Sequence, residues 1–150
     1  SALIASLYVA LTFVSALLGL SSGAVQVRLS EALCVLAVFT PSAIPGLAIG
    51  CLLANLITGC VVWDVVFGAV ATLIGAVGTY LLKKRPILAL LPPILSNTVI
   101  IPFVLKYAYG LTEGIIYMFI TIGIGEIISV GILGFILYKS LIPYKNRIFR

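Results

Sequence analysis

The chain has 150 residues, of which 63% are hydrophobic and only 9% are charged, with a net charge of +5. About a quarter of the residues in a soluble domain are charged, so this composition excludes a soluble fold and predicts an integral membrane protein. The chain has no histidine, which removes the commonest metal ligand and general base. At about 20 residues per span, residues 1–150 form a single transmembrane domain without room for a soluble catalytic unit.

The first apolar segment, residues 2–20, is interpreted as a membrane helix. It could pass for a signal peptide, but no basic region precedes it in this sequence. Small residues recur on it at intervals of four: Ala2, Ser6 and Ala10. Such a face lets another helix approach closely, so it is a candidate docking surface for a partner.

The next part of the chain is an uncharged run over residues 32–63, interrupted by Pro41 and Pro45. Proline removes a backbone donor and disfavours helix in the residue before it. We therefore expect two helices here, residues 29–40 and 44–60. The first would be only about 18 Å long at 1.5 Å per residue, too short to cross the membrane alone. We expect it to lie tilted or recessed within the bundle.

Three further helices are expected after this run. Residues 64–82 end at the basic cluster Lys83-Lys84-Arg85. Residues 87–107 contain three prolines, at 92, 93 and 102, and should be kinked. Residues 112–138 are long enough to span the membrane with considerable tilt.

Six spans place both ends of the chain on one side of the membrane, and the basic residues predict which side. Seven of the nine Lys and Arg residues fall on the side of the chain ends, and only Arg28 and Lys106 fall on the other. Because basic residues favour the cytoplasmic side, we predict an all-α bundle of six transmembrane helices in the bacterial plasma membrane, with cytoplasmic N- and C-termini. The basic charge then orients the protein in the bilayer, and no nucleic acid is expected. A five-span reading, with residues 33–57 as one crossing, is the main alternative.

Polar residues collect toward the outer half of the predicted bundle. Ionisable groups inside a membrane are expensive and are typical of a site or pathway, so we list the following as candidate substrate-binding residues: Gln26, Arg28, Glu31, Asn55, Trp63, Asp64, Asn97 and Glu126. No basic residue lies near Glu126 in the sequence, so it needs a partner, a proton or a ligand. Trp63 could equally belong to an ordinary aromatic belt at the membrane interface.

Structural roles are open for most of the other candidates. Arg28 and Glu31 are three residues apart and could simply pair on one turn. Asp64 could stabilise the start of its helix. Asn55 and Asn97 could hold helices together. None of these roles excludes a part in substrate binding.

No sequence motif of catalysis is present. The sequence lacks a P-loop, a GxSxG nucleophile elbow and an HExxH zinc motif, so we expect neither an enzyme nor ATP hydrolysis by this chain. Its three cysteines lie in apolar runs without the spacing of metal ligands and are interpreted as small buried residues. We expect no cofactor and no metal.

Several short stretches, spread over nearly the whole chain, resemble the sequence pattern of a known protein family. They are densest between residues 26 and 73, where they comprise residues 26–33, 40–41, 44–47, 50–52, 54–55, 64–68 and 71–73, and they are looser afterwards, at Leu91-Pro92-Pro93 and Gly125-Glu126. Together they resemble the QueT family of queuosine-precursor transporters, which are substrate-binding S components of energy-coupling factor (ECF) transporters.

The resemblance implies six helices with cytoplasmic ends and an outward-facing ligand site. It also implies that the small residues of the first helix contact a transmembrane T component, and that two cytoplasmic ATPases supply energy. The implied substrate is a queuosine precursor such as 7-aminomethyl-7-deazaguanine. Its guanine-like edge offers two N–H donors that suit a carboxylate, and its amine suits a second one, so Glu31 and Glu126 could divide these tasks.

Two other functions stay open at this point. The chain could be an S component for another micronutrient. It could also be a non-transporting membrane subunit that assembles through small-residue faces such as Gly46 and Gly50.

Overall fold

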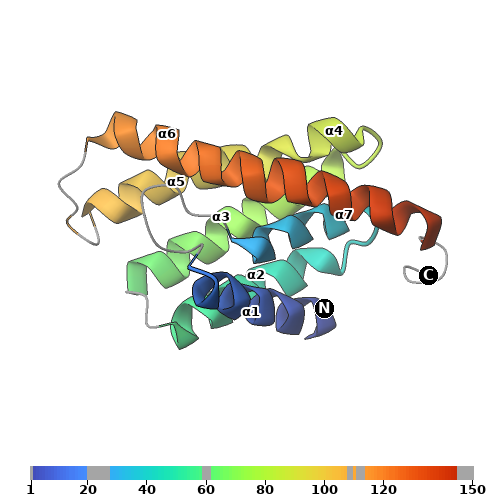
Figure 1. The fold of residues 1–150 in the computed structure, drawn as a ribbon, viewed down its shortest axis with the longest axis horizontal. Helices are drawn as coiled ribbons and strands as arrows, with labels where there is room; N and C mark the ends of the chain where they lie inside the picture. The colour runs from blue at the N-terminus through green and yellow to red at the C-terminus, as the bar shows by residue number, and fades with distance from the viewer. Residues whose placement is uncertain (1, 20–27, 59–61, 108–109, 111–113, 145–150) are drawn as a thin grey trace.

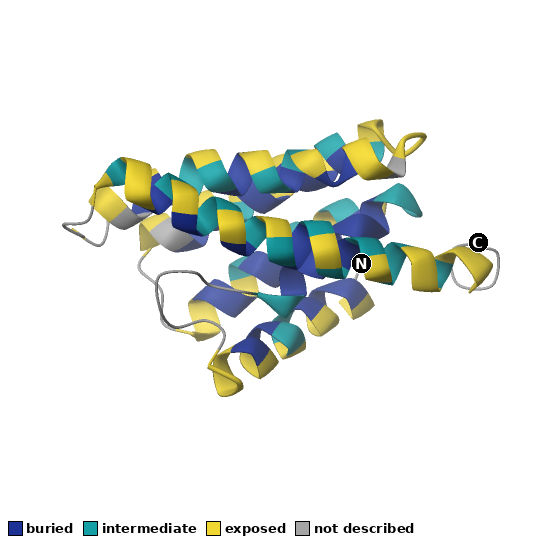
Figure 2. Cartoon of the chain, turned by 45° about the horizontal axis from the view of Figure 1, so that its top comes forward, coloured by how far each residue is buried: buried dark blue, intermediate teal, exposed yellow. Residues whose placement is uncertain are grey.

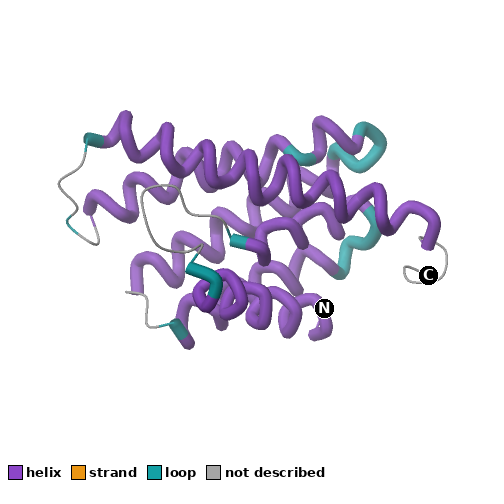
Figure 3. Tube along the Cα trace, in the orientation of Figure 1, coloured by secondary structure: helices purple, strands orange, loops and turns teal. Residues whose placement is uncertain are grey.

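The computed structural model describes residues 2–19, 28–58, 62–107, 110 and 114–144. These residues form helices joined by turns, without strands (Figures 1 and 3). In chain order the elements are α1 (Ala2–Leu17), η1 (Leu29–Val38), α2 (Ala43–Ile57), α3 (Val62–Leu81), α4 (Pro86–Ala89), α5 (Leu91–Tyr107), α6 (Ile115–Glu126), η2 (Ile127–Leu133), α7 (Gly134–Leu141) and η3 (Ile142–Tyr144). Since α4 and α5 follow one path and α6, η2 and α7 another, the described residues confirm the prediction of six helical segments.

The bundle is apolar on its outside, as a membrane protein must be. Two stretches, Ile87–Val104 and Ile115–Tyr144, are each long and apolar enough to cross a membrane. Leu, Ile, Val and Phe side chains are exposed along every long helix, as the yellow outer surfaces in Figure 2 show. Several polar side chains, by contrast, are buried inside. This distribution suits lipid outside and a specific site within.

Both ends of the described chain lie at the same end of the bundle. Figure 1 shows the start of α1, the turn between α3 and α4 and the end of α7 together on the right. That turn carries the exposed residues Lys83, Lys84 and Arg85. Both ends of the described chain and this basic turn thus lie on one side, as the six-span prediction requires.

Helix α1 has two different faces. Its inner face buries Ile4, Ala5, Tyr8, Thr12 and Ser15. The predicted docking residues Ala2, Ser6 and Ala10 are all exposed, because a spacing of four keeps them on one side of the helix.

Helices α1 and α2 approach each other closely at Gly50. A Cβ atom added there would lie 2.7 Å from the Cβ of Tyr8 and 3.1 Å from the backbone of Ala5. Gly46 is buried as well. The glycine pair is therefore used inside the molecule, and the interpretation of Gly46 and Gly50 as an assembly face is wrong.

The short segment η1 lies at the centre of the bundle, and its residues 30–37 are buried. It is a 3₁₀ helix and not the expected α-helix, and it ends at Val38 and not at residue 40. At about 2.0 Å per residue its ten residues reach about 20 Å, less than the roughly 30 Å of the hydrocarbon core. Figure 1 shows it, in light blue, beginning well inside the bundle. A turn over residues 39–42 separates it from α2, so the five-span alternative is wrong.

Helices α3 and α5 pack through glycines against prolines. A Cβ atom on Gly78 would lie 2.4 Å from the Cβ of Pro92, and one on Gly75 would lie 2.7 Å from the Cα of Pro93. Both prolines lie in the first turn of α5, where backbone N–H groups have no partner within the helix. The predicted kink is a break at Leu90, between α4 and α5.

The last segment is one continuous helix with a π-helical section, η2, in its middle. It extends to Leu141, a few residues beyond the expected end, whereas α1 ends at Leu17, before the expected residue 20. Sections of π-helix are rare and frequently mark functional sites. Here η2 begins directly after Glu126.

Candidate functional site

A cluster of polar residues inside the bundle lies at the beginning of η1. Arg28 precedes this helix, and Glu31 follows one 3₁₀ turn later, with its backbone N–H bonded to the Arg28 carbonyl at 3.1 Å. In a 3₁₀ helix, side chains three residues apart lie one above the other, so Glu31 and Cys34 share one face of η1, and Arg28 precedes the helix in an extended conformation. Glu31 is only 2% exposed, although it is a carboxylate at the centre of a membrane protein.

Both carboxylate oxygens of Glu31 have partners. The phenol of Tyr8, from α1, donates a hydrogen bond to Oε1. The thiol of Cys34 donates to Oε2, with 3.7 Å between Sγ and Oε2. Tyr8 is fully buried, so this contact fixes α1 and η1 relative to each other in a dry environment, where hydrogen bonds are strong.

Two more α1 side chains hold the first turn of η1. The Thr12 hydroxyl donates to the Ser30 hydroxyl at 3.0 Å. The Ser15 hydroxyl accepts the backbone N–H of Leu29 at 2.8 Å. The first N–H groups of a helix lack partners within it, so Ser15 satisfies a donor that would otherwise be costly in lipid.

The long C-terminal helix approaches η1 from the other side. The Ser129 hydroxyl, in η2, accepts the backbone N–H of Arg28 at 3.1 Å. Glu126 lies three residues earlier in the same helix, and its Oε2 is buried without a hydrogen-bond partner among the described residues. Arg28 interacts electrostatically with both Glu31 and Glu126. Three elements, α1, η1 and η2, therefore bring one cation and two carboxylates together.

A second buried polar atom without a partner in the described part of the chain faces the same helix. It is Oγ1 of Thr98, on α5. A Cβ atom on Gly123 would lie 3.6 Å from Cγ2 of Thr98, so Thr98 packs against α6. Glu126 is three residues after Gly123 and lies on a neighbouring part of that helix surface.

A sequence model of the QueT transporter family matches residues 1–143. The chain belongs to the QueT transporter family. This confirms the resemblance found in the sequence. Neither the curated proteins nor the solved structures include a match. Because the QueT family consists of transporters, a buried polar cluster in this chain is a candidate for substrate recognition, and the chain is a transport protein and not an enzyme.

Three of the other predicted site residues, Asn55, Asn97 and Trp63, belong to α2, α5 and α3. Asn97 and Asn55 are buried, and each amide bonds one turn back on its own helix, to the Pro93 carbonyl at 2.9 Å and to Cys51 Sγ at 3.7 Å. Trp63 is 62% exposed and stacks on Phe67. Gln26 and the Asp64 side chain lie outside the described residues.

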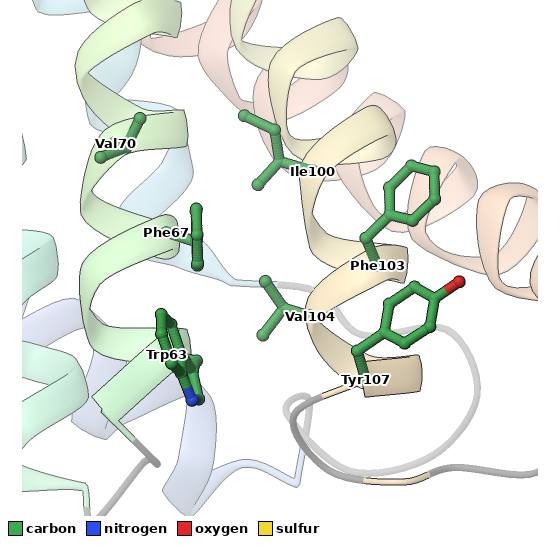
Figure 4. Close-up of a pocket in the computed structure, with 7 residues that line it drawn as sticks. All are labelled: Trp63, Phe67, Val70, Ile100, Phe103, Val104 and Tyr107. Carbon is green, nitrogen blue, oxygen red and sulfur yellow. The ribbon is translucent and has the colours of Figure 1, made fainter.

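Trp63 belongs to an apolar groove between α3 and α5. The groove has a volume of about 520 Å³, and Figure 4 shows the residues that line it: Trp63, Phe67, Val70, Ile100, Phe103, Val104 and Tyr107. Its backbone and side chains offer almost no polar surface, whereas a purine-like edge needs donors and acceptors. The groove is also open on the outside of the bundle, where lipid surrounds this QueT chain. The polar cluster at η1 is therefore the better candidate for the substrate site.

Sequence reasoning missed the partners of this cluster, chiefly Tyr8, Thr12, Ser15 and Ser129. A signal was present for three of them. Tyr8, Thr12 and Ser15 recur at intervals of four and three, which places them on one helix face. Ser129 had no such signal, because a π-helical section changes which residues face inward.

Proposed function

We propose that this chain is the substrate-binding S component of an ECF-type ABC importer, and that it takes up a queuosine precursor, a 7-deazaguanine such as 7-aminomethyl-7-deazaguanine. One observation carries the proposal: Arg28 lies close enough to Glu31 and Glu126 to interact electrostatically with both, and Glu31 and Oε2 of Glu126 are buried. Ionisable side chains at such a depth are typical of a substrate site. Membership of the QueT family supports the class of substrate.

The chemistry of the cluster suits a deazaguanine. Such a ligand offers N–H donors that match a carboxylate and a carbonyl oxygen that needs a donor. Arg28 is a donor for the carbonyl oxygen, and the carboxylates of the cluster are acceptors for N–H groups. Gln26, Asn55, Asn97 and Asp64 stay candidates for further contacts, and Trp63 is one only if the ligand reaches the α3–α5 groove.

The outer face of α1 is proposed as the docking surface for the T component. Ala2, Ser6 and Ala10 are exposed there, and small residues allow close helix approach within a membrane. The sequence has no P-loop, so two ATPase subunits on the cytoplasmic side would supply the energy. The excess of basic residues at the end that holds both chain termini supports cytoplasmic termini in a bacterial plasma membrane.

The two alternative functions differ in how well they agree with the buried polar cluster and the helix packing. An S component for another micronutrient is compatible with the cluster. The non-transporting subunit is not supported, because α1 of the same molecule already packs against the surface at Gly50 that would bind a partner.

Isothermal titration of the detergent-purified chain with 7-aminomethyl-7-deazaguanine tests the proposal, with guanine and riboflavin as controls. We expect saturable, selective binding. Binding of riboflavin alone would point to another micronutrient. A monodisperse, helical protein that binds none of the three would contradict the proposed function.

The docking face is tested separately. Ala2→Trp, Ser6→Trp and Ala10→Trp should abolish uptake by cells that carry the complete importer and leave ligand binding to the purified chain unchanged. Ile74→Trp is the matched control, because Ile74 is also exposed, on α3. Loss of binding in the α1 variants would show that this face serves internal packing instead.

A further inference from the structure

Among the described side chains inside the bundle, acidic residues outnumber basic ones. Among the acidic and basic residues with described side chains, Lys83, Lys84, Arg85, Lys106 and Lys139 are exposed. The others are Arg28, Glu31 and Glu126, one cation and two anions. If both carboxylates are ionised, this part of the site holds one uncompensated negative charge, which is expensive in a membrane.

The two carboxylates are in different situations. Glu31 accepts hydrogen bonds on both oxygens, from Tyr8 and from Cys34. It lies on η1 in contact with α1, and its bonds are made without a ligand. Glu31 therefore has the features of a positioning residue, which holds the first turn of η1 and Arg28 in place.

Glu126 has the opposite features. Its Oε2 is buried and has no partner among the described residues. Removing a carboxylate from water without a hydrogen bond costs free energy, so this oxygen calls for a donor that the described residues do not supply. Thr98, across from α6, has a second such atom, Oγ1.

We propose that Glu126 is the residue that selects a positively charged ligand, and that the site prefers a precursor with a protonated amine over a neutral analogue of the same ring. This inference rests on the proposed function. A primary alkyl amine is protonated at neutral pH, as in lysine. Its N–H groups would give Glu126 the charge-assisted hydrogen bond that it lacks and neutralise the extra charge. Thr98 would be a neighbouring acceptor for the same ammonium group.

Two ligands that differ only in the side arm test this inference. They are 7-aminomethyl-7-deazaguanine, which carries a cation, and 7-cyano-7-deazaguanine, whose nitrile is neutral and donates no hydrogen bond. Both are titrated into wild-type protein and into Glu126→Gln, Glu126→Asp and Glu31→Gln. We expect the wild type to bind the aminomethyl compound about 10- to 100-fold more tightly, which is the range of one charge-assisted hydrogen bond.

The variants separate the two carboxylates. Glu126→Gln should weaken binding of the aminomethyl compound and leave the cyano compound nearly unchanged, so that the preference disappears. Glu126→Asp should restore part of the preference, because it restores the charge. Glu31→Gln should weaken both ligands by a similar factor, since it disturbs the position of η1 and not a contact with the side arm.

Each outcome has a distinct meaning. Equal binding of both ligands by the wild type, or a preference that persists in Glu126→Gln, would overturn the selection by Glu126 and leave the proposed function intact. Binding of neither ligand would overturn both. The wild-type preference is measured without any substitution, so a variant that fails to fold does not remove the test.

Discussion

The two sides of the bundle are held together in different ways. On one side, α1 and η2 bind η1 through side-chain hydroxyls: Tyr8 to Glu31, Thr12 to Ser30, and Ser129 to the Arg28 backbone. On the other side, α3 and α5 meet through glycines packed onto Pro92 and Pro93, and two buried hydroxyls, those of Ser96 and Thr79, donate to the backbone carbonyls of Ala71 and Ala89.

Within a membrane, lipid is as apolar as the helix surface, so helices associate by close packing and by hydrogen bonds. Here glycine–proline packing is most prominent between α3 and α5, and side-chain hydrogen bonds are most prominent around η1. Close packing tolerates no added volume but involves no group that a ligand needs. The hydrogen bonds surround the ionisable residues of the site. Substitutions on the packed side should therefore affect stability alone, and substitutions on the hydrogen-bonded side should affect stability and binding together.

The largest effect is expected from Gly78→Val, on the packed side. The new side chain would overlap Pro92, and we expect a loss of about 3 kcal/mol, at the upper end of typical overpacking costs. Thermal unfolding in detergent measures it, and the remaining folded protein should bind ligand normally. Gly134→Ala is the control, because its Cβ would meet Leu90 at an ordinary 3.5 Å. Equal stability of the two variants would contradict the close-packing argument.

Tyr8→Phe should have the next largest effect. It removes the donor to Oε1 of Glu31 and leaves that oxygen unsatisfied, at a cost of about 1–3 kcal/mol. In contrast to Gly78→Val, it should also lower ligand affinity, since Glu31 would no longer be fixed. Tyr138→Phe is the control, because Tyr138 contacts Phe39 through its ring. Unchanged ligand affinity in Tyr8→Phe would show that this contact of α1 does not contribute to ligand binding.

A smaller effect is expected from Ser129→Ala. This substitution leaves the backbone N–H of Arg28 without its acceptor, which should cost about 1 kcal/mol and weaken binding modestly. Ser140→Ala tests whether loss of any serine has this effect, because exposed Ser140 donates to a carbonyl of its own helix, that of Ile136. The same loss of affinity in both variants would argue against a role of η2 in the site.

The smallest effect should come from Trp63→Phe, in the α3–α5 groove. Because Trp63 is exposed, we expect stability and affinity to change by less than about 0.5 kcal/mol, or about twofold. Titration of the variant is the measurement. A much larger loss of affinity would show that Trp63 is a stacking platform for the ligand and would move the site toward the groove.

The sequence predicted the helices well because charges and prolines mark their ends. It identified the break at Pro41 and the recessed position of residues 29–40, since length alone excludes a full crossing. It could not show that this segment is a 3₁₀ helix, because tertiary packing decides this. The same limit applies to the site. The positions of the charged residues in the sequence identified Glu31 and Glu126 as candidates. Only the structure shows that Glu31 already accepts hydrogen bonds from Tyr8 and Cys34.

The shortness of η1 has a consequence for how the protein is made. A segment of ten residues that includes a carboxylate is too short and too polar to be recognised as a membrane span during synthesis. Its first turn is satisfied by α1 and by η2, at opposite ends of the chain. The start of η1 can therefore make all of these contacts only after the helix that contains η2 has been inserted.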